Sequence, residues 1–113
     1  MPFINVNISK NLTNDQKNTL QLKIGEIIPV ISGKTIGNTM TKIDAGCDIF
    51  MGGKAVEAVF CDIRFFTAAP MDQKTELIKQ LSDAFNELFG IPMGNIYINL
   101  IELDHWGSGG RYM

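Results

Sequence analysis

The sequence predicts an α+β fold of two layers, in which two βαβ units share a mixed four-stranded sheet with two helices on one face. Three observations lead to this fold class: alternating strand patterns, two segments with helical apolar spacing, and an internal match between the halves. The chain has 113 residues, a length typical of one domain with a single core. We therefore interpret residues 1–113 as one domain.

The first half reads as a strand, a capped helix and a second strand. Side chains alternate in character from Pro2 to Ile8, which is typical of a half-buried strand. Residues 13–16 (Thr-Asn-Asp-Gln) have the form of a capping box at a helix N-terminus. Pro29 predicts a kink or an early helix end, and residues 39–43 are expected to form the second strand. The apolar stripe of this helix is Leu20, Ile24, Ile27, Ile28 and Ile31.

The second half has the same order of patterns. Residues 55–66 are rich in β-branched and aromatic side chains and predict a long strand. A helix is expected from residue 71 to 89, followed by a turn at 90–94 and a final strand at 95–102. The apolar face expected for this helix is Leu77, Leu81, Ala84, Phe85 and Leu88.

A shift of 57 positions aligns the two halves, so that residues 15–17 (Asp-Gln-Lys) fall on the identical residues 72–74. Gly33 and Gly37 then fall on Gly90 and Gly94, at the helix exits. Right-handed crossovers would place both helices on one face of the sheet. The other face is expected to be apolar and buried against further subunits, so the sequence predicts an oligomer.

Composition argues against several classes of function. The net charge is −2 and the basic residues are scattered, which disfavours nucleic acid or a membrane surface as partner. No apolar run approaches the roughly 20 residues needed to span a bilayer, and no signal peptide is evident. We expect a cytoplasmic protein, with leaderless secretion left open. Cys47 and Cys61 are too few for a disulfide scaffold, and with His105 they form a poor metal set.

The chain starts Met-Pro, and the small second residue permits removal of the initiator methionine. A free amine on Pro2 would titrate near ~7.7–8.0 without perturbation. Burial among apolar groups and a nearby cation would both lower its pKa, giving a neutral base at physiological pH. The alternative is a proline that is merely tolerated at a strand start, where no ladder donor is needed. In the internal match Pro2 falls on Val59, so the fold itself does not require proline there.

Five short segments stand in order along the chain: Pro2-Phe3-Ile4, Gly33-Lys34, Phe50-Met51-Gly52-Gly53, Tyr97-Ile98-Asn99 and Trp106-Gly107. Together they resemble the tautomerase superfamily. The resemblance covers nearly the whole chain and is closest to the branch of macrophage migration inhibitory factor (MIF) and D-dopachrome tautomerase. It implies an MIF-like fold and a homotrimer with active sites at the subunit interfaces. It also implies keto–enol tautomerisation of phenylpyruvate-like α-keto acids, without metal or cofactor.

The resemblance also implies a role for each matching residue. Pro2 is the catalytic base, and Lys34 binds the substrate's carboxylate or developing enolate oxygen. Phe66 stands where the family contacts substrate through a backbone N–H, although the family residue is usually aliphatic. Tyr97 and Asn99 share one strand face and would reach into the pocket of a neighbouring subunit. The alternatives are a solvated lysine, a core phenylalanine and an ordinary sheet face.

Some residues depart from the family pattern or stay unassigned. One cysteine of the Cys-x-x-Cys pair is replaced by Ala58, so thiol oxidoreductase activity is not expected. Trp106 would line the pocket mouth, an interface or the core, and the tail after it is expected to be short and flexible. Arg111 in the tail could bind a carboxylate or be solvated, and the role of Arg64 in the long strand stays open. His105 receives no role.

Three readings of function remain, all without metal or cofactor. The first is a phenylpyruvate-type tautomerase, with a small-molecule keto acid as its partner. The second is a proline-dependent dehalogenase, hydratase or decarboxylase, which ranks lower because such enzymes use further arginines near the proline. The third is a cytokine-like signalling or binding protein with incidental tautomerase activity.

Overall fold

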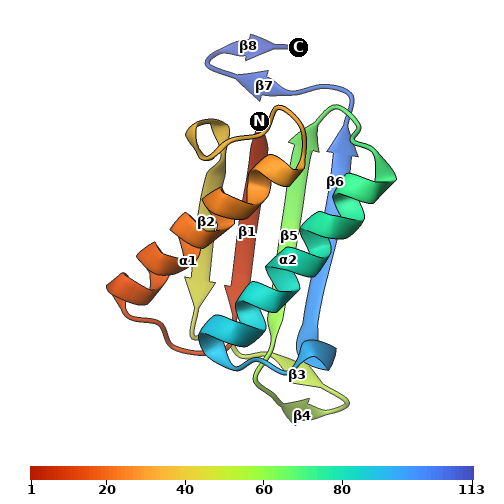
Figure 1. Ribbon diagram of the computed structural model, residues 1–113. Helices are drawn as coiled ribbons and strands as arrows, with labels where there is room; N and C mark the ends of the chain where they lie inside the picture. The colour runs from red at the N-terminus through yellow and green to blue at the C-terminus, as the bar shows by residue number, and fades with distance from the viewer.

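A computed structural model describes all residues, 1–113, and its centre is a mixed four-stranded sheet (Figure 1). The strands are β1 (Pro2–Ile8), β2 (Met40–Ala45), β5 (Val59–Phe66) and β6 (Ile96–Leu103), in the spatial order β2-β1-β5-β6. β1 is parallel to β2, and β5 is parallel to β6, whereas β1 and β5 are antiparallel. The predicted fold class, with two βαβ units around one sheet, is confirmed.

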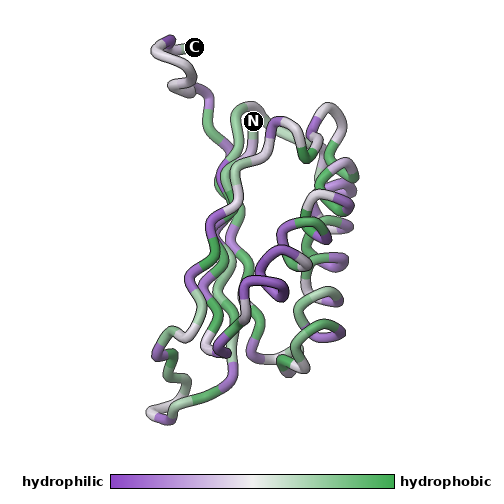
Figure 2. Tube along the Cα trace, turned by 90° about the vertical axis from the view of Figure 1, so that its left-hand side faces the viewer, coloured by the Kyte–Doolittle hydropathy of each residue, from purple (hydrophilic) through white to green (hydrophobic).

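Two helices cover one face of this sheet, as Figure 2 shows in side view. α1 (Asn14–Ile27) begins with the predicted capping box, in which Thr13 Oγ1 accepts from the Gln16 N–H and Gln16 Oε1 accepts from the Thr13 N–H. It ends as expected before Pro29, where one 3₁₀ turn (Ile28–Val30) follows. The second helix, α2 (Met71–Phe89), has both predicted ends.

The predicted apolar face of α2 is wrong at one position. Leu88 is 38% exposed, whereas Phe89 is buried in the core. The chain turns sharply after the helix, because Gly90 adopts a left-handed φ of 69° and the Gly90 N–H donates to the Asn86 carbonyl. Phe89 follows the buried Phe85 by four positions on the same helix face, and it packs into the core where Leu88 was expected. The buried residues of α2 are Leu77, Leu81, Ala84, Phe85 and Phe89.

The long strand begins later than predicted. Residues 54–55 form β4 (Lys54–Ala55), which pairs with β3 (Phe50–Met51) in a separate two-stranded ribbon. Gly52 and Gly53, with φ of 59° and 79°, make the turn between them. The ribbon projects beyond the sheet at the end opposite the N-terminus (Figure 1).

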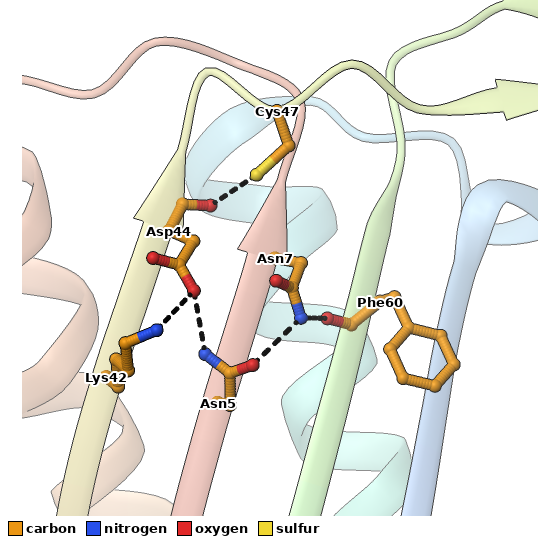
Figure 3. A network of polar contacts seen from close by, with 6 residues as sticks. All are labelled: Asn5, Asn7, Lys42, Asp44, Cys47 and Phe60. Carbon is orange, nitrogen blue, oxygen red and sulfur yellow. Dashed lines mark hydrogen bonds and ion pairs between the residues drawn. The ribbon is translucent and has the colours of Figure 1, made fainter.

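The face of the sheet that carries no helix is less apolar than expected. Met40, Phe60 and Tyr97 lie exposed on it, but a hydrogen-bonded polar network occupies the strands between them. In Figure 3 the Asp44 carboxylate accepts from Asn5 Nδ2 at 3.1 Å and from Lys42 Nζ at 2.9 Å. Asn7 extends the network across the sheet, because its Nδ2 donates both to Asn5 Oδ1 and to the Phe60 carbonyl.

The tail after Trp106 is a hairpin, which corrects the expectation of a flexible end. β7 (Gly107–Ser108) pairs with β8 (Arg111–Tyr112), and Trp106 and Met113 exchange two backbone hydrogen bonds of 3.0 and 2.8 Å. The rings of His105 and Tyr112 stack with centroids 5.5 Å apart. The hairpin lies beyond the end of the sheet at which the chain starts (Figure 1).

The remaining short elements are the 3₁₀ turns Ile36–Asn38 and Met93–Asn95. One core cluster of 19 buried residues lies between the sheet and the helices. Cys61 belongs to it, and burial raises the pKa of its thiol to about 12, as expected for an inert core cysteine. No helix is long and apolar enough to cross a membrane.

Candidate active site

The start of β1 lies at the end of the sheet where β5 and β6 also end (Figure 1). Pro2 is buried and pairs with Phe65 on β5, and Phe65 pairs in turn with Glu102 on β6. Because β1 and β5 are antiparallel, the start of β1 lies beside the ends of β5 and β6. The N-terminus, the loop after α1 and the C-terminal hairpin therefore lie at the same end of the sheet.

Lys34 reaches this end of the sheet from the loop after α1. The loop turns at Gly33, whose φ is 81°, and the Lys34 N–H donates to the Ile31 carbonyl at 3.0 Å. Two further bonds tie the loop to α2: the Ser32 N–H donates to Gln73 Oε1 at 3.0 Å, and Gln73 Nε2 donates to Ser32 Oγ at 2.9 Å. The backbone before Lys34 is therefore fixed by α2 and by the turn that follows α1.

The Lys34 ammonium is held at the end of β5. Its Nζ donates to the Phe66 carbonyl at 3.1 Å and lies 5.3 Å from the centroid of the Phe65 ring. The next residue, Thr67, has an unusual positive φ of 71°, and its N–H donates to the Leu103 carbonyl at 2.9 Å. The twisted backbone at Thr67 and the bond to β6 fix the direction of the Phe66 carbonyl, and so the place of the ammonium.

The N-terminal amine lies in the same corner. Because the chain here starts at Met1, the free amine belongs to Met1 and the Pro2 nitrogen is an amide. The pKa of this amine is lowered from 8.0 to about 6, chiefly by burial and then by a hydrogen bond with Lys34 and the positive charge of Lys34. The Met1 amine stands one residue ahead of the place that a processed Pro2 amine would take. This corner therefore favours an uncharged amine near neutral pH.

A cleft of about 890 Å³ opens at this end of the sheet, between the chain start and the C-terminal hairpin. Its volume is within the range of small-molecule sites. Pro2 and Phe3 line it from the sheet, and Trp106 and Tyr112 line it from the hairpin. Trp106 lies in the cleft wall and outside the core cluster. A second, smaller cleft at the opposite end of the sheet is lined by Cys47, among others, and contains none of the predicted site residues.

Tyr97 and Asn99 lie far from Pro2 within the chain. Tyr97 precedes Glu102, the β6 residue level with Pro2, by five positions, and Asn99 precedes it by three. At about 3.3 Å per residue and 4.8 Å per strand, their Cα atoms are roughly 19 and 14 Å from that of Pro2. Both side chains lie exposed on the face without helices. One chain therefore does not bring these two residues to its own Pro2.

The structure thus brings together Pro2, Lys34 and the backbone of Phe66, and leaves Tyr97 and Asn99 apart. Sequence reasoning missed Phe65 beneath the ammonium, although its place in the alternating pattern of β5 puts it on the helix side beside Pro2. It also missed the contact of Gln73 with the Lys34 loop, for which the sequence carries no signal.

Comparisons with known proteins agree in fold. No protein-family model matches the chain, and no curated protein matches its sequence. Among solved structures, Leishmania major MIF2 superposes with a TM-score of 0.91 at 21% identity, covering 100% of this chain and 97% of that one. The MIF-like protein EhMIF of Entamoeba histolytica gives 0.87 at 24% identity, covering 99% and 98%. A fused 4-OT described as an asymmetric trimer gives 0.85 at 16% identity, covering 96% and 94%. These likenesses confirm the MIF-like tautomerase fold expected from the sequence.

Proposed function

We propose that this chain is a cofactor-independent keto–enol tautomerase of phenylpyruvate-like α-keto acids, with the N-terminal amine of Pro2 as its general base. The observation that carries the proposal is the corner that lowers the pKa of a terminal amine to about 6, with Lys34 beside it. Such a base is neutral at physiological pH and can accept a proton from carbon.

The reaction needs one base and one cation. The neutral Pro2 amine takes a proton from the carbon next to the keto group, so a C–H bond breaks and an N–H bond forms. The electron pair of the C–H bond forms the C=C bond of the enolate, and the π electrons of the C=O bond move to the keto oxygen, which becomes negatively charged. The Lys34 ammonium stabilises this negative charge, and the proline then returns its proton to the oxygen to give the enol. The reverse sequence converts enol to keto.

A homotrimer would complete the site. Tyr97 and Asn99 lie roughly 19 and 14 Å from their own Pro2, so they can act at a Pro2 only from another subunit. Exposed Met40, Phe60 and Ile101 on the same sheet face favour burial against further copies. The trimeric state of the fused 4-OT with this fold supports the same number.

Removal of Met1 tests the base directly. One purified sample that retains Met1 is divided, and half is treated with methionine aminopeptidase until intact mass shows complete removal. We expect phenylpyruvate tautomerase activity only in the treated half, because an amide nitrogen has no basic lone pair. The Pro2→Gly variant, treated in the same way, should keep a little activity since an amine remains. Equal turnover by the two halves of the wild-type sample would refute the proline base.

Subunit mixing tests the site between chains. One parent carries an extra residue before Pro2 and so lacks the amine, and the other is Tyr97→Phe/Asn99→Ala. Each should be inactive alone, and mixed trimers obtained by co-refolding should regain activity at sites that pair an intact Pro2 with intact Tyr97 and Asn99. No recovery, despite mixing shown by native mass spectrometry, would mean that these residues do not act across subunits.

A further inference from the structure

The side chain of Asn38 binds the backbone on both sides of Lys34. Its Oδ1 accepts from the Thr35 N–H at 3.0 Å, and its Nδ2 donates to the Gly33 carbonyl at 3.3 Å. The Thr35 N–H belongs to the peptide unit after Lys34, and the Gly33 carbonyl belongs to the peptide unit before it. Because each peptide unit is planar, the backbone of Lys34 can turn only about its φ and ψ. One side-chain amide therefore restrains both dihedral angles of Lys34.

The loop around Lys34 is held by hydrogen bonds more than by burial. Ser32, Gly33 and residues 35–38 are all exposed, and segments with few buried contacts open more easily than a core does. The backbone bond of the Lys34 N–H runs back to Ile31, whereas the Asn38 N–H donates forward of Lys34, to the Thr35 carbonyl at 3.2 Å. Of the hydrogen bonds in this loop, only the bond from Asn38 Nδ2 to Gly33 joins the residues after Lys34 to those before it.

The Lys34 side chain depends on this backbone for its direction. Its Nζ donates to the Phe66 carbonyl, and no carboxylate pairs with it. A lysine ammonium is carried on a flexible four-carbon stem, so one contact at its tip does not by itself fix where it lies. The direction of the stem is set where it starts, at the backbone of Lys34.

Asn38 also connects this lysine to the cleft. Asn38 lines the cleft together with Pro2, whereas Lys34 is not among the lining residues. The place of the ammonium relative to the cleft is therefore a property of the loop between them. The amide of Asn38 lies at the cleft wall and is bonded to both neighbours of Lys34.

We propose that Asn38 is a positioning residue for Lys34: its amide fixes the two peptide units that flank the lysine and so sets where the ammonium lies at the end of β5. The use of that ammonium in catalysis rests on the proposed function. The internal match supplies a control, because it places Asn95 on Asn38 and each asparagine ends a 3₁₀ turn. Asn95 Nδ2, however, donates to the Glu57 carbonyl at 2.9 Å, at the opposite end of the sheet.

The position of Lys34 can be measured without substrate, because its Nζ lies 5.3 Å from the centroid of the Phe65 ring. The ring current of Phe65 should separate the NMR signal of the ε-methylene protons of Lys34 from those of exposed lysines. This signal is assigned in protein with isotope-labelled lysine as the one missing from Lys34→Met. We expect Asn38→Ala to move it toward the exposed lysines and Asn95→Ala to leave it in place. Asn38→Asp keeps the acceptor but loses the donor, so its signal should lie between.

A double-mutant cycle on kcat/KM for phenylpyruvate, with Met1-free protein, measures whether Asn38 acts through Lys34. Asn38→Ala alone should lower kcat/KM about tenfold, as loss of one hydrogen-bonded contact implies. In the Lys34→Met background the same substitution should change kcat/KM by less than about twofold, because the ammonium that it positions is absent. Urea unfolding verifies that each variant is folded, and Asn38→Asp takes the place of Asn38→Ala in the cycle if the alanine variant is not.

Three results would overturn the proposal: an unmoved Lys34 signal in the Asn38 variants, an equal movement in Asn95→Ala, or an equal loss of kcat/KM in both backgrounds. The two measurements also separate this proposal from the proposed function. Turnover with an unmoved signal leaves the tautomerase standing and removes the role of Asn38. A wild type that does not turn over phenylpyruvate refutes the proposed function, whereas the Lys34 signal still decides whether Asn38 positions the lysine.

Discussion

Replacing Lys34 with methionine should change both the base and the binding of substrate. The variant keeps most of the aliphatic stem but loses the ammonium, which donates to the Phe66 carbonyl at 3.1 Å. Burial is the largest cause of the lowered amine pKa, and Lys34 supplies the two others. Because burial remains in Lys34→Met, we expect the pKa of the terminal amine to rise but to stay below the unperturbed 8.0.

The size of the effect depends on pH. At pH 7 an amine with a pKa of about 6 is about 90% neutral, whereas one with a pKa of 8.0 is about 10% neutral. The change in the pKa of the base therefore lowers kcat/KM by at most about tenfold. Loss of a charge-assisted contact to the substrate costs about 1.5–3 kcal/mol, or about 10- to 150-fold in kcat/KM. Above pH 9 both proteins hold a neutral amine, so only the second loss remains.

The assay is the pH profile of kcat/KM for phenylpyruvate between pH 5 and 10 with Met1-free protein. In the wild type kcat/KM should rise with pH through an apparent pKa below the unperturbed value of a terminal amine, because the neutral amine is the active form, and Lys34→Met should shift that rise upward and lower the plateau. Lys79→Met is the matched control, since Lys79 lies exposed on α2 and pairs only with Asp83. A profile of Lys34→Met that superposes on the wild type would show that Lys34 neither tunes the base nor contacts substrate.

Three further changes test the frame around the site, each by urea unfolding. Thr67→Gly should raise the free energy of unfolding by about 1 kcal/mol, because a β-branched residue is strained at a φ of 71°; a loss would contradict the strain. Gly25→Ala should lower it by about 1–3 kcal/mol despite better helix propensity, since the added Cβ would overlap the packed Ile36 side chain, and a gain would show that Ile36 moves freely. Glu102 has a lowered pKa, chiefly through its hydrogen bond from Lys74, so the unfolded state binds the proton more readily. Its contribution should be complete above about pH 4.5 and be lost as pH falls through the folded pKa, and Glu102→Gln should flatten this acid limb; an unchanged limb would exclude Glu102 as its source.

Local patterns predicted most of the elements. The capping box at Thr13, the early end before Pro29 and both ends of α2 depend on neighbours within a few residues, so they are visible in the sequence. The internal match then gives the topology, because two βαβ units of right-handed crossover can share a sheet in few ways. The match also predicts both helices on one face, as observed (Figure 2).

Features that depend on distant partners were not predictable. Alternation in β1 places Asn5 and Asn7 on the face without helices, but Asp44, the acceptor that makes this face polar, is on β2. Only the register of the folded sheet brings them together (Figure 3). Similarly, residues 55–66 have strand composition throughout, yet the turn at Gly52 and Gly53 assigns the first of them to a separate ribbon.

The two units are equivalent in fold but not in chemistry, and the difference explains why one chain has one candidate site. Gln16 completes the capping box of α1 with Thr13, and the internal match places Gln73 at the same point of α2. α2, however, is capped by Pro70, whose side chain makes no hydrogen bond, so Gln73 is free to bind Ser32 and hold the Lys34 loop. The first strands of the two units also differ. Val59, the counterpart of Pro2, lies in the middle of the chain at the opposite end of the sheet, so it has no free amine. Only the first unit can therefore carry a terminal amine at its strand start, and Gln73 of the second unit holds the loop before Lys34.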